Sequence, residues 1–430
     1  MKFKRSNRIN QRIERISTHH LVVGIDIAKE THVAGPVNFR GIELSSTFCF
    51  SNDREGFERL MHWVVQLQKK HRLTKVIFGM ESTGHYGVPL AKWLSGNNQD
   101  VVQVNPLTTK RNKENRDNRP SKSDPKDAII IADAVSRGYY NDWVWTEGIY
   151  HKIRCAVNEQ EALADDLASI GNRLQMLLDQ AFPEFTKVFK DWSCPRAIAT
   201  LKTSPLPEDL TGLCIEQIIA SWYEAGMRRA GGTRGREAAA RLLAAARASV
   251  GISESAAELR REIKRTVRRY EWIAADKKTV EDEIQTLLVQ VPREELQPLE
   301  ELGLGPFIKA ALLANTGPLK NYKHGRQVMA LAGLNLCEST SGKRKGQIVM
   351  SKRGRRQLRK YLYLAVVGLV ANHPAFKSWH RHNVHHLKMK KQQSIFKLIG
   401  KLTRIMVALA HTVDAFDVHR AIPLGQPVVA

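Results

Sequence analysis

Residues 21–29 read LVVGIDIAK, and this stretch decides the fold. A run of apolar residues interrupted by a single acid is typical of a buried strand, and it places Asp26 near the end of that strand. Two further strand candidates follow closely, at residues 31–39 and 42–50. Because the three candidates are neighbours in the sequence, we expect them to pair as an antiparallel meander.

Helices and strands alternate after this meander. Apolar residues recur at helical spacing in residues 54–71. The elements expected next are a strand at 75–80, a helix at 86–94, a strand at 100–104 and a helix at 124–137. The order βββαβαβα predicts an α/β domain with a mixed sheet and the ribonuclease H topology. A Rossmann fold is the competing interpretation, but no GxGxxG follows the first strand.

Four acidic residues lie at the ends of these elements. Asp26 is in the first strand, Glu81 directly follows the fourth, and Asp124 and Asp127 open the last helix on one face. Taken singly, each acid is more often structural, since Asp124 would cap a helix and Glu81 could close a turn. In the ribonuclease H topology, however, the four carboxylates converge. Hard oxygen ligands of this kind suit Mg²⁺, with Mn²⁺ as the alternative, and two such ions can clamp both oxygens of a phosphodiester displacement.

The net charge is +24, which favours a polyanionic partner such as nucleic acid. Residues 341–404 carry 17 Lys and Arg and no acid, and within them apolar residues spaced by three or four predict an amphipathic helix with a basic face. A second basic cluster lies at residues 110–122, and a third at residues 2–15, which we expect to be a solvated face or a flexible tail. The side chains expected to bind nucleic acid are Lys110, Arg111, Lys113, Arg116, Arg119, Lys122, Lys343, Arg344, Lys345, Lys352, Arg353, Arg355, Arg356, Arg359 and Lys360.

Other classes of protein are disfavoured. The longest apolar run is too short to cross a membrane, and the polar, basic N-terminus does not look like a secretory signal. The five cysteines are scattered and form no CxxC, so neither a disulfide framework nor a zinc ribbon is indicated. We therefore expect a cytoplasmic protein with no membrane partner. The length of 430 residues suits two or three domains.

The middle of the chain predicts two long helices. Leucine and isoleucine recur at alternating steps of four and three from Leu163 to Leu177, and a second helical pattern covers residues 256–291. The two helices could pack within one chain or between chains. Between them we expect a small helical insertion with a flexible loop at residues 231–235.

The last third contains two glycine-containing segments. Residues 302–316 predict a turn followed by a helix, in which Gly303 and Gly305 would let backbone amides approach a phosphate. Further on, Ser341 and Gly342 precede a basic stretch. An open serine beside cations could act as a nucleophile on a phosphodiester, although the residues alone favour an ordinary loop.

The motifs GIDIAK, ESTG and SDPKDA are followed in order by ELGLGPFIKAALLANTG, ALAGLNL and TSGKRKGQIVMSKRGRRQLR. This series resembles the DEDD transposases of the insertion-sequence-110 type, with an IS-1111-like subgroup as one option, over residues 20–410. The resemblance implies a basic tail at 1–19 and a RuvC-like catalytic domain at 20–148. It also implies a helical coiled-coil connector at 149–295, with an insertion at 192–252, and a C-terminal transposase domain at 296–430.

The resemblance also implies a chemistry. The four acids would be catalytic and bind Mg²⁺, and Ser341 would be the nucleophile that forms a transient phosphoserine, with Ser339 and Ser351 as rivals. The implied partners are donor and target DNA, a structured guide RNA and further copies of the chain in a homodimer or homotetramer, acting at the nucleoid. A RuvC-like, metal-dependent nuclease that uses water as nucleophile is the alternative.

Overall fold

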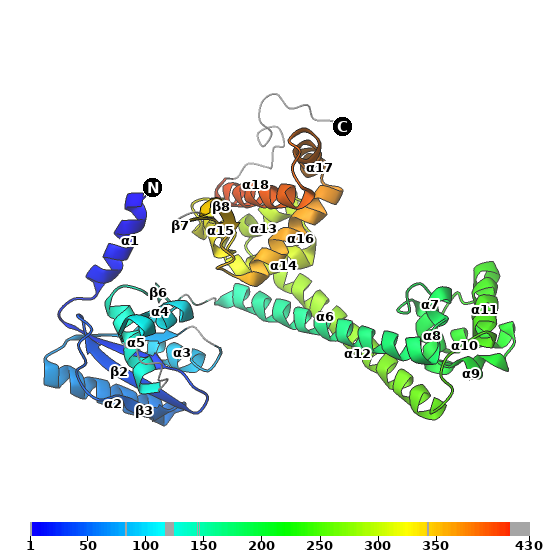
Figure 1. Cartoon of the computed structure of the whole chain (residues 1–430), viewed down its shortest axis with the longest axis horizontal. Coiled ribbons are helices and arrows are strands. Elements are labelled where there is room, and N and C mark those ends of the chain that lie inside the picture. Colours follow the sequence, from blue (N-terminus) through cyan, green and yellow to red (C-terminus); the bar gives the residue numbers. More distant parts are fainter. Residues whose placement is uncertain are drawn as a thin grey trace. The chain divides into compact units, whose positions relative to one another are not determined.

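The structure is a computed structural model that describes residues 2–81, 84–116, 124–143, 145, 147–341 and 344–412. The chain divides into two compact units, Met1–Trp145 and Thr146–Ala430, called here the N-terminal and C-terminal units (Figure 1). Among the described residues, no helix has the length and apolar character that crossing a membrane requires.

The N-terminal unit is built on a six-stranded mixed sheet in the order β3-β2-β1-β4-β5-β6. The central strand β1 pairs with β2 in the antiparallel and with β4 in the parallel direction, and β4 pairs with β5 in parallel. This arrangement confirms the predicted meander and mixed sheet. The strands are β1 His20–Asp26, β2 Thr31–Asn38, β3 Phe48–Ser51, β4 Lys75–Glu81, β5 Asp100–Val104 and β6 Asn141–Asp142.

Helices cover both faces of this sheet. Side chains alternate along β1, so Leu21, Val23 and Ile25 pack with residues of α2 and α3 on one face. Val22 faces the opposite side and packs with α5. The helices of this unit, apart from the N-terminal one, are α2 Arg54–His71, α3 Val88–Gly96, α4 Pro106–Arg116 and α5 Asp124–Ser136.

Three glycines in register let α5 lie unusually close to the sheet. Gly35 on β2, Gly24 on β1 and Gly79 on β4 are direct neighbours across the strands. A Cβ atom at Gly24 would stand 2.1 Å from the carbonyl oxygen of Ala128, and one at Gly79 would stand 2.4 Å from a methyl of Val135. Any larger residue would therefore push α5 away from the strands, together with the acids in its first turn.

The predicted elements of the sheet domain differ from the structure at the third strand, at α4 and at the short strand β6, which was not predicted. The strand expected at 42–50 is present only as β3, and the residues before it make one isolated bridge between Val37 and Glu43. Helix α4 was not predicted because its sequence is polar. It begins after Asn105, whose side chain accepts a hydrogen bond of 2.9 Å from the N–H of Leu107.

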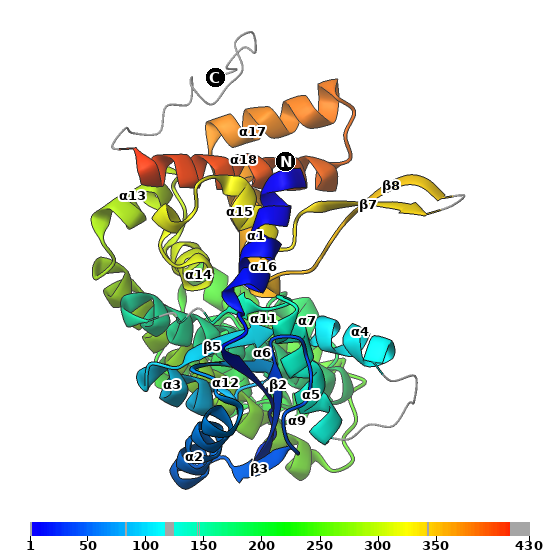
Figure 2. The same ribbon diagram turned by 90° about the vertical axis from the view of Figure 1, so that its left-hand side faces the viewer.

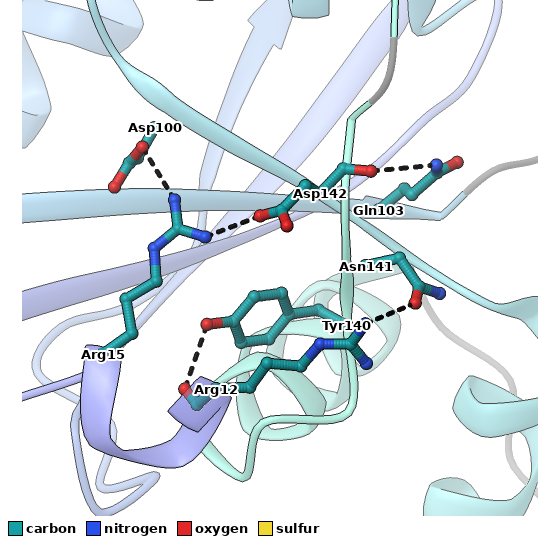
Figure 3. Close-up of polar contacts among 7 residues, drawn as sticks. All are labelled: Arg12, Arg15, Asp100, Gln103, Tyr140, Asn141 and Asp142. Carbon is teal, nitrogen blue, oxygen red and sulfur yellow. Dashed lines mark hydrogen bonds and ion pairs between the residues drawn. The ribbon is translucent and has the colours of Figure 1, made fainter. Parts of the chain in front are cut away.

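The basic N-terminal segment is a helix, α1 Lys2–Arg15, whose C-terminal end is tied to the edge of the sheet (Figure 3). The Arg15 guanidinium lies 2.9 Å from Asp100 and 2.6 Å from Asp142. The Tyr140 hydroxyl donates a hydrogen bond of 3.0 Å to the carbonyl of Arg12. The expectation of a flexible tail is therefore wrong for this end of the segment, because its partners lie about a hundred residues away in the sequence.

The C-terminal unit contains a pair of long helices, α6 Gly148–Ala181 and α12 Ala256–Val289. They run antiparallel, since Arg173 pairs with Glu262 near one end of the pair and Gln160 bonds Glu281 farther along (Figure 1). The heptad residues Ile170, Leu174 and Leu177 are buried. Of the two arrangements that the sequence left open, the structure therefore shows the packing of α6 and α12 within one chain.

Each end of this helix pair contributes to a separate hydrophobic core. One core joins it to the helical insertion, and the other joins it to the C-terminal helices. The helices of the insertion region are α7 Phe185–Val188, α8 Pro195–Thr203, α9 Pro207–Thr211, α10 Ile215–Glu224 and α11 Gly232–Arg247. The flexible loop expected at 231–235 is wrong, because all but its first residue belong to the first turn of α11, which packs against Ala230 through Gly235.

The rest of the C-terminal unit is mainly helical with one β-hairpin, and the predicted turn and helix at 302–316 are present. Figure 2 shows the hairpin, β7 and β8, extending away from α15 and α16. The elements are α13 Arg293–Glu301, α14 Pro306–Thr316, η1 Leu319–Asn321, α15 Gly325–Leu331, β7 Leu336–Ser341, β8 Arg344–Met350, α16 Arg356–Asn372, α17 Pro374–Arg381, η2 His382–His386 and α18 Lys391–His411.

Candidate active site and nucleic-acid-binding surfaces

The four predicted acids gather at one edge of the N-terminal sheet. Asp26 and Glu81 are the last residues of β1 and β4, which pair in parallel up to Ile25 and Met80, so the two carboxylates follow neighbouring strands. Asp124 is the first residue of α5, the helix that lies against the glycine row. Asp127 belongs to the first turn of the same helix and is buried. These four residues are called the acid cluster below.

The pKa values show that the carboxylates of the acid cluster influence one another. Burial is the largest cause that raises the pKa of Asp26 to about 6, and the charges of Asp127, Asp124 and Glu81 contribute to this rise in that order. Burial also raises the pKa of Glu81, to which the charge of Asp127 contributes. The fold therefore holds like charges close together in a half-buried place, where each makes ionisation of the others less favourable.

One lysine lies within the acid cluster. The Lys113 ammonium, on α4, stands 2.5 Å and 2.6 Å from the two carboxylate oxygens of Asp127. It also lowers the pKa values of Asp26 and Glu81, against the effects of burial and of the other acids. Lys113 was expected to bind nucleic acid, and its described partner is instead an acid of the cluster. This contact could not be predicted from the sequence, because α4 itself was not predicted.

The structure describes only some of the other basic residues of the segment 110–122. Lys110 and Arg111 lie on α4 and are exposed. Arg116 ends α4, but its side chain lies outside the described residues, as do Arg119 and Lys122 entirely.

The donor set of the acid cluster fits a hard divalent cation. Four carboxylates supply only oxygen ligands, and a bound cation would relieve the repulsion that raises the pKa of Asp26. Within the described residues, no group of three acidic, His or Cys side chains is arranged to hold a metal ion, and Lys113 provides the neutralising charge. A divalent ion would therefore compete with Lys113 for Asp127.

The predicted nucleophile lies at the end of the β-hairpin. Ser341 is the last residue of β7 and pairs with Arg344 of β8, next to an irregularity in the register, whereas Ser339 pairs with Gln347. Gly342 and Lys343 lie outside the described residues, as do the side chains of 338–348, which include Arg344 and Lys345.

The third serine candidate is bound within the fold. The Ser351 hydroxyl donates a hydrogen bond of 3.1 Å to the carbonyl of Gly333 and accepts one of 3.4 Å from the N–H of Arg353. These bonds fix the turn between β8 and α16 and occupy the hydroxyl.

The basic face of α16 is partly used within the C-terminal unit. Arg355 donates to the carbonyl of Asn315, and Arg359 donates a 2.7 Å hydrogen bond to that of Ala332. The Lys360 ammonium lies 2.7 Å from Glu161 on α6. These three cations hold α16 to neighbouring elements. In the part of the chain that the structure describes, the exposed side chains of Lys352, Arg353 and Arg356 have no such partner.

The glycine turn before α14 is open. Gly303 has a φ of +69°, and Gly305 immediately precedes α14. A Cβ atom at either position would meet no other atom within 4 Å, so the backbone here is accessible. This accessibility agrees with the predicted approach of a phosphate to the turn.

Comparison with known proteins finds family matches in two regions of the chain. Residues 23–183 match the DEDD IS110 family, described as transposase, and residues 299–381 match the transposase IS116/IS110/IS902 family. The chain belongs to the IS110-type transposases. An uncharacterized 44.8 kDa protein of the insertion element IS116 from Streptomyces clavuligerus is 23% identical over 357 residues, which cover 81% of this chain and 85% of the relative.

The transposase is thus an enzyme that acts on DNA. Its first matched region contains the whole acid cluster, and its second contains the glycine turn, Ser341 and the basic face of α16. Sequence reasoning found these features but missed the glycine row. A glycine inside an apolar strand, as in LVVGID and KVIFGME, was the available signal, since it often marks the close approach of another backbone.

Proposed function

We propose that this insertion-sequence transposase catalyses Mg²⁺-dependent DNA strand exchange, with Asp26, Glu81, Asp124 and Asp127 holding the metal. The observation that carries the proposal is that Asp26 and Glu81 end neighbouring strands, beside the first turn of α5, which contains Asp124 and Asp127. Bound Mg²⁺ would stabilise the negative charge on the attacking and leaving oxygens during displacement at a phosphodiester. Mn²⁺ has the same preference for oxygen ligands and is the alternative ion.

The nucleophile in this proposal is Ser341. The Ser341 hydroxyl loses its proton as its oxygen forms a bond to the DNA phosphorus and the bond to the 3′-oxygen breaks, and the departing oxygen takes up a proton to become a 3′-hydroxyl. A 3′-hydroxyl of another strand then attacks the phosphoserine and releases the serine, so no net hydrolysis occurs. The position of Ser341 at the end of β7 supports this role, as does the basic sequence that follows it. Ser351 is a weaker rival because its hydroxyl is already bonded.

The partners in this proposal are donor and target DNA, a structured guide RNA and further copies of the chain. The large positive charge supports binding to both nucleic acids. Pairing with a guide would supply sequence specificity while the protein contacts the backbone. The acid cluster and Ser341 belong to different units of the chain, so a site shared between copies in a dimer or tetramer is part of the proposal.

The alternative function is a RuvC-like nuclease that uses water. The acid cluster favours it, since two metal ions and water are sufficient for phosphodiester hydrolysis. The two functions differ in whether the protein becomes attached to DNA.

In the deciding experiment, the protein is incubated with DNA of its insertion sequence, the proposed guide RNA and Mg²⁺, and the mixture is then denatured. We expect a protein–DNA adduct that survives denaturation and is absent for Ser341→Ala. Ser339→Ala and Ser351→Ala are the matched controls and should still form it. An adduct that persists in Ser341→Ala would exclude this nucleophile, and cleavage without any adduct would favour the nuclease.

A further inference from the structure

The helical insertion contains a cavity with a strongly basic lining. The cavity has a volume of about 430 Å³, which lies in the range of pockets that bind small ligands. Four arginines line it, Arg196 on α8, Arg229 before α11, and Arg234 and Arg241 on α11, and the only acid among the lining residues is Glu237. We call this feature the arginine cavity.

Most of the positive charge of the arginine cavity has no ion-pair partner among the described residues. In the described part of the chain, the side chains of Arg229, Arg234 and Arg241 have neither a hydrogen-bond nor an ion-pair partner. Arg236 on the same helix points elsewhere and lies 3.6 Å from Glu216. Four arginine charges face the single carboxylate of Glu237, so the cavity keeps a net positive charge that would stabilise an anion.

Arg196 is held in place before any ligand binds. Its guanidinium carbon lies 5.8 Å from the centre of the Trp222 ring, and its Nη2 donates a 3.4 Å hydrogen bond to the carbonyl of Arg229. Its Nε is buried and has no hydrogen-bond partner among the described residues. A guanidinium fixed in this way matches the oxygens of a phosphate and loses little side-chain entropy on binding.

The rest of the lining is apolar. Val188, Phe189, Pro195 and Met227 form part of the wall beside the arginines. An inorganic anion would leave this apolar surface unused, whereas a nucleotide would place its phosphate on the arginines and its base against Val188, Pro195 and Met227, since Phe189 itself is largely buried. Unstacked bases also pack on guanidinium planes, which the arginines supply.

We propose that the arginine cavity binds one nucleotide unit of a single-stranded nucleic acid. The base must leave its stack to reach the apolar wall, so a duplex is excluded and the sugar is not distinguished. The site is independent of the acid cluster and of Ser341. The helical insertion is thereby a nucleic-acid-binding module rather than a spacer at the end of α6 and α12.

A cysteine in the wall allows a local test in the full-length protein. Cys194 lines the arginine cavity and is partly exposed, and Cys214 is exposed elsewhere in the insertion. The rate of alkylation of each by N-ethylmaleimide is measured by peptide mass spectrometry, with single-stranded RNA, single-stranded DNA, duplex DNA or inorganic phosphate present. If alkylation occurs only in the free state, a strand at ten times its dissociation constant slows Cys194 about tenfold. Cys214 should be unaffected.

Two double variants complete the test. Removing the cavity charges with Arg234→Ala and Arg241→Ala should abolish the protection of Cys194 by either single strand. Removing two other charges of α11, with Arg236→Ala and Arg247→Ala, should leave it intact. The proposal is overturned if single strands do not slow Cys194, if the cavity variant is still protected, or if duplex DNA or phosphate alone protects equally well.

Discussion

The acid cluster and the basic face of α16 are both groups of like charge, but they differ in how many of their charges have partners within the protein. Four carboxylates at the sheet edge share a single described lysine, and burial together with the charges of the other three acids raises the pKa of Asp26. Arg355, the N-cap of α16, and Arg359 and Lys360 in its first turns each have a carbonyl or carboxylate partner within the C-terminal unit. A charged group that the fold leaves unbalanced indicates a ligand, whereas a balanced one holds elements together.

Close packing of α5 against the sheet holds the four carboxylates together despite their mutual repulsion. The glycine row brings α5 against β1, β2 and β4, and the acids at its start must then lie close to Asp26 and Glu81. The repulsion among the four carboxylates lowers the folding stability of the N-terminal unit. We therefore expect that the acid cluster serves the proposed metal site and does not contribute to stability. This difference between the two regions can be tested by substitution.

The largest expected effect is on activity, from Asp26→Asn. In the proposed function this carboxylate holds the metal, so its loss should reduce strand exchange about a thousandfold, because metal stabilisation of a transition state amounts to several kcal/mol. The thermal midpoint should stay the same or rise, since a repelling charge is removed. Asp100→Asn, which removes a partner of Arg15, is the control and should retain activity. Activity of Asp26→Asn within tenfold of the wild type would refute a metal-binding role.

The next effect is on stability, from Gly24→Ala. The added Cβ would stand 2.1 Å from the Ala128 carbonyl, and we expect overpacking to lower the free energy of unfolding by about 2–3 kcal/mol. Gly96→Ala is the matched control, since a Cβ there meets no atom within 4 Å. Denaturant unfolding measures both. Equal stability of the two variants would mean that α5 can move away from the sheet without cost.

The sequence predicted the acid cluster better than the roles of the basic residues, for a physical reason. Strand and helix periodicity places Asp26, Glu81, Asp124 and Asp127 at the ends of adjacent elements, so topology alone brings them together. The partner of a basic side chain depends on tertiary packing. Lys360 meets Glu161 across 199 residues of sequence, and no local pattern contains that contact.

The helices and strands also differ in whether local sequence or a distant contact determines them. Helix α2 and strand β5 were predicted at their observed bounds because their apolar residues recur regularly. Helix α4 is polar and depends on the cap by Asn105, and α1 is attached through Arg15 to distant acids, so neither arrangement follows from periodicity.

The pH dependence of stability should distinguish repelling from stabilised carboxylates. Asp26 has its pKa raised from 3.8 to about 6, so the folded state holds its proton more tightly than the unfolded state does. Relative to Asp26→Asn, the wild type should therefore lose stability as the pH rises from about 4 to 6. Unfolding midpoints in urea across this range measure the difference.

Asp53 supplies the opposite case as a control. Its carboxylate accepts a hydrogen bond from the Gly56 N–H at the start of α2, which lowers its pKa. Relative to Asp53→Asn, the wild type should lose stability as the pH falls through the lowered pKa. Parallel pH profiles for the Asp26 and Asp53 pairs would contradict the contrast between the two environments.

The smallest effects should separate the free and the bound cations of α16. Arg356→Ala removes an exposed charge without a described partner, and it should reduce the slope of log K for DNA binding against log salt by about 1. Lys360→Ala breaks the pair with Glu161, so it should lower the free energy of unfolding by up to about 1 kcal/mol and leave the salt slope unchanged. Salt titrations of binding and urea unfolding measure the two variants side by side. If Lys360→Ala also lowers the salt slope by a full unit, its ammonium leaves Glu161 to bind phosphate, and the division between balanced and unbalanced charges fails at this position.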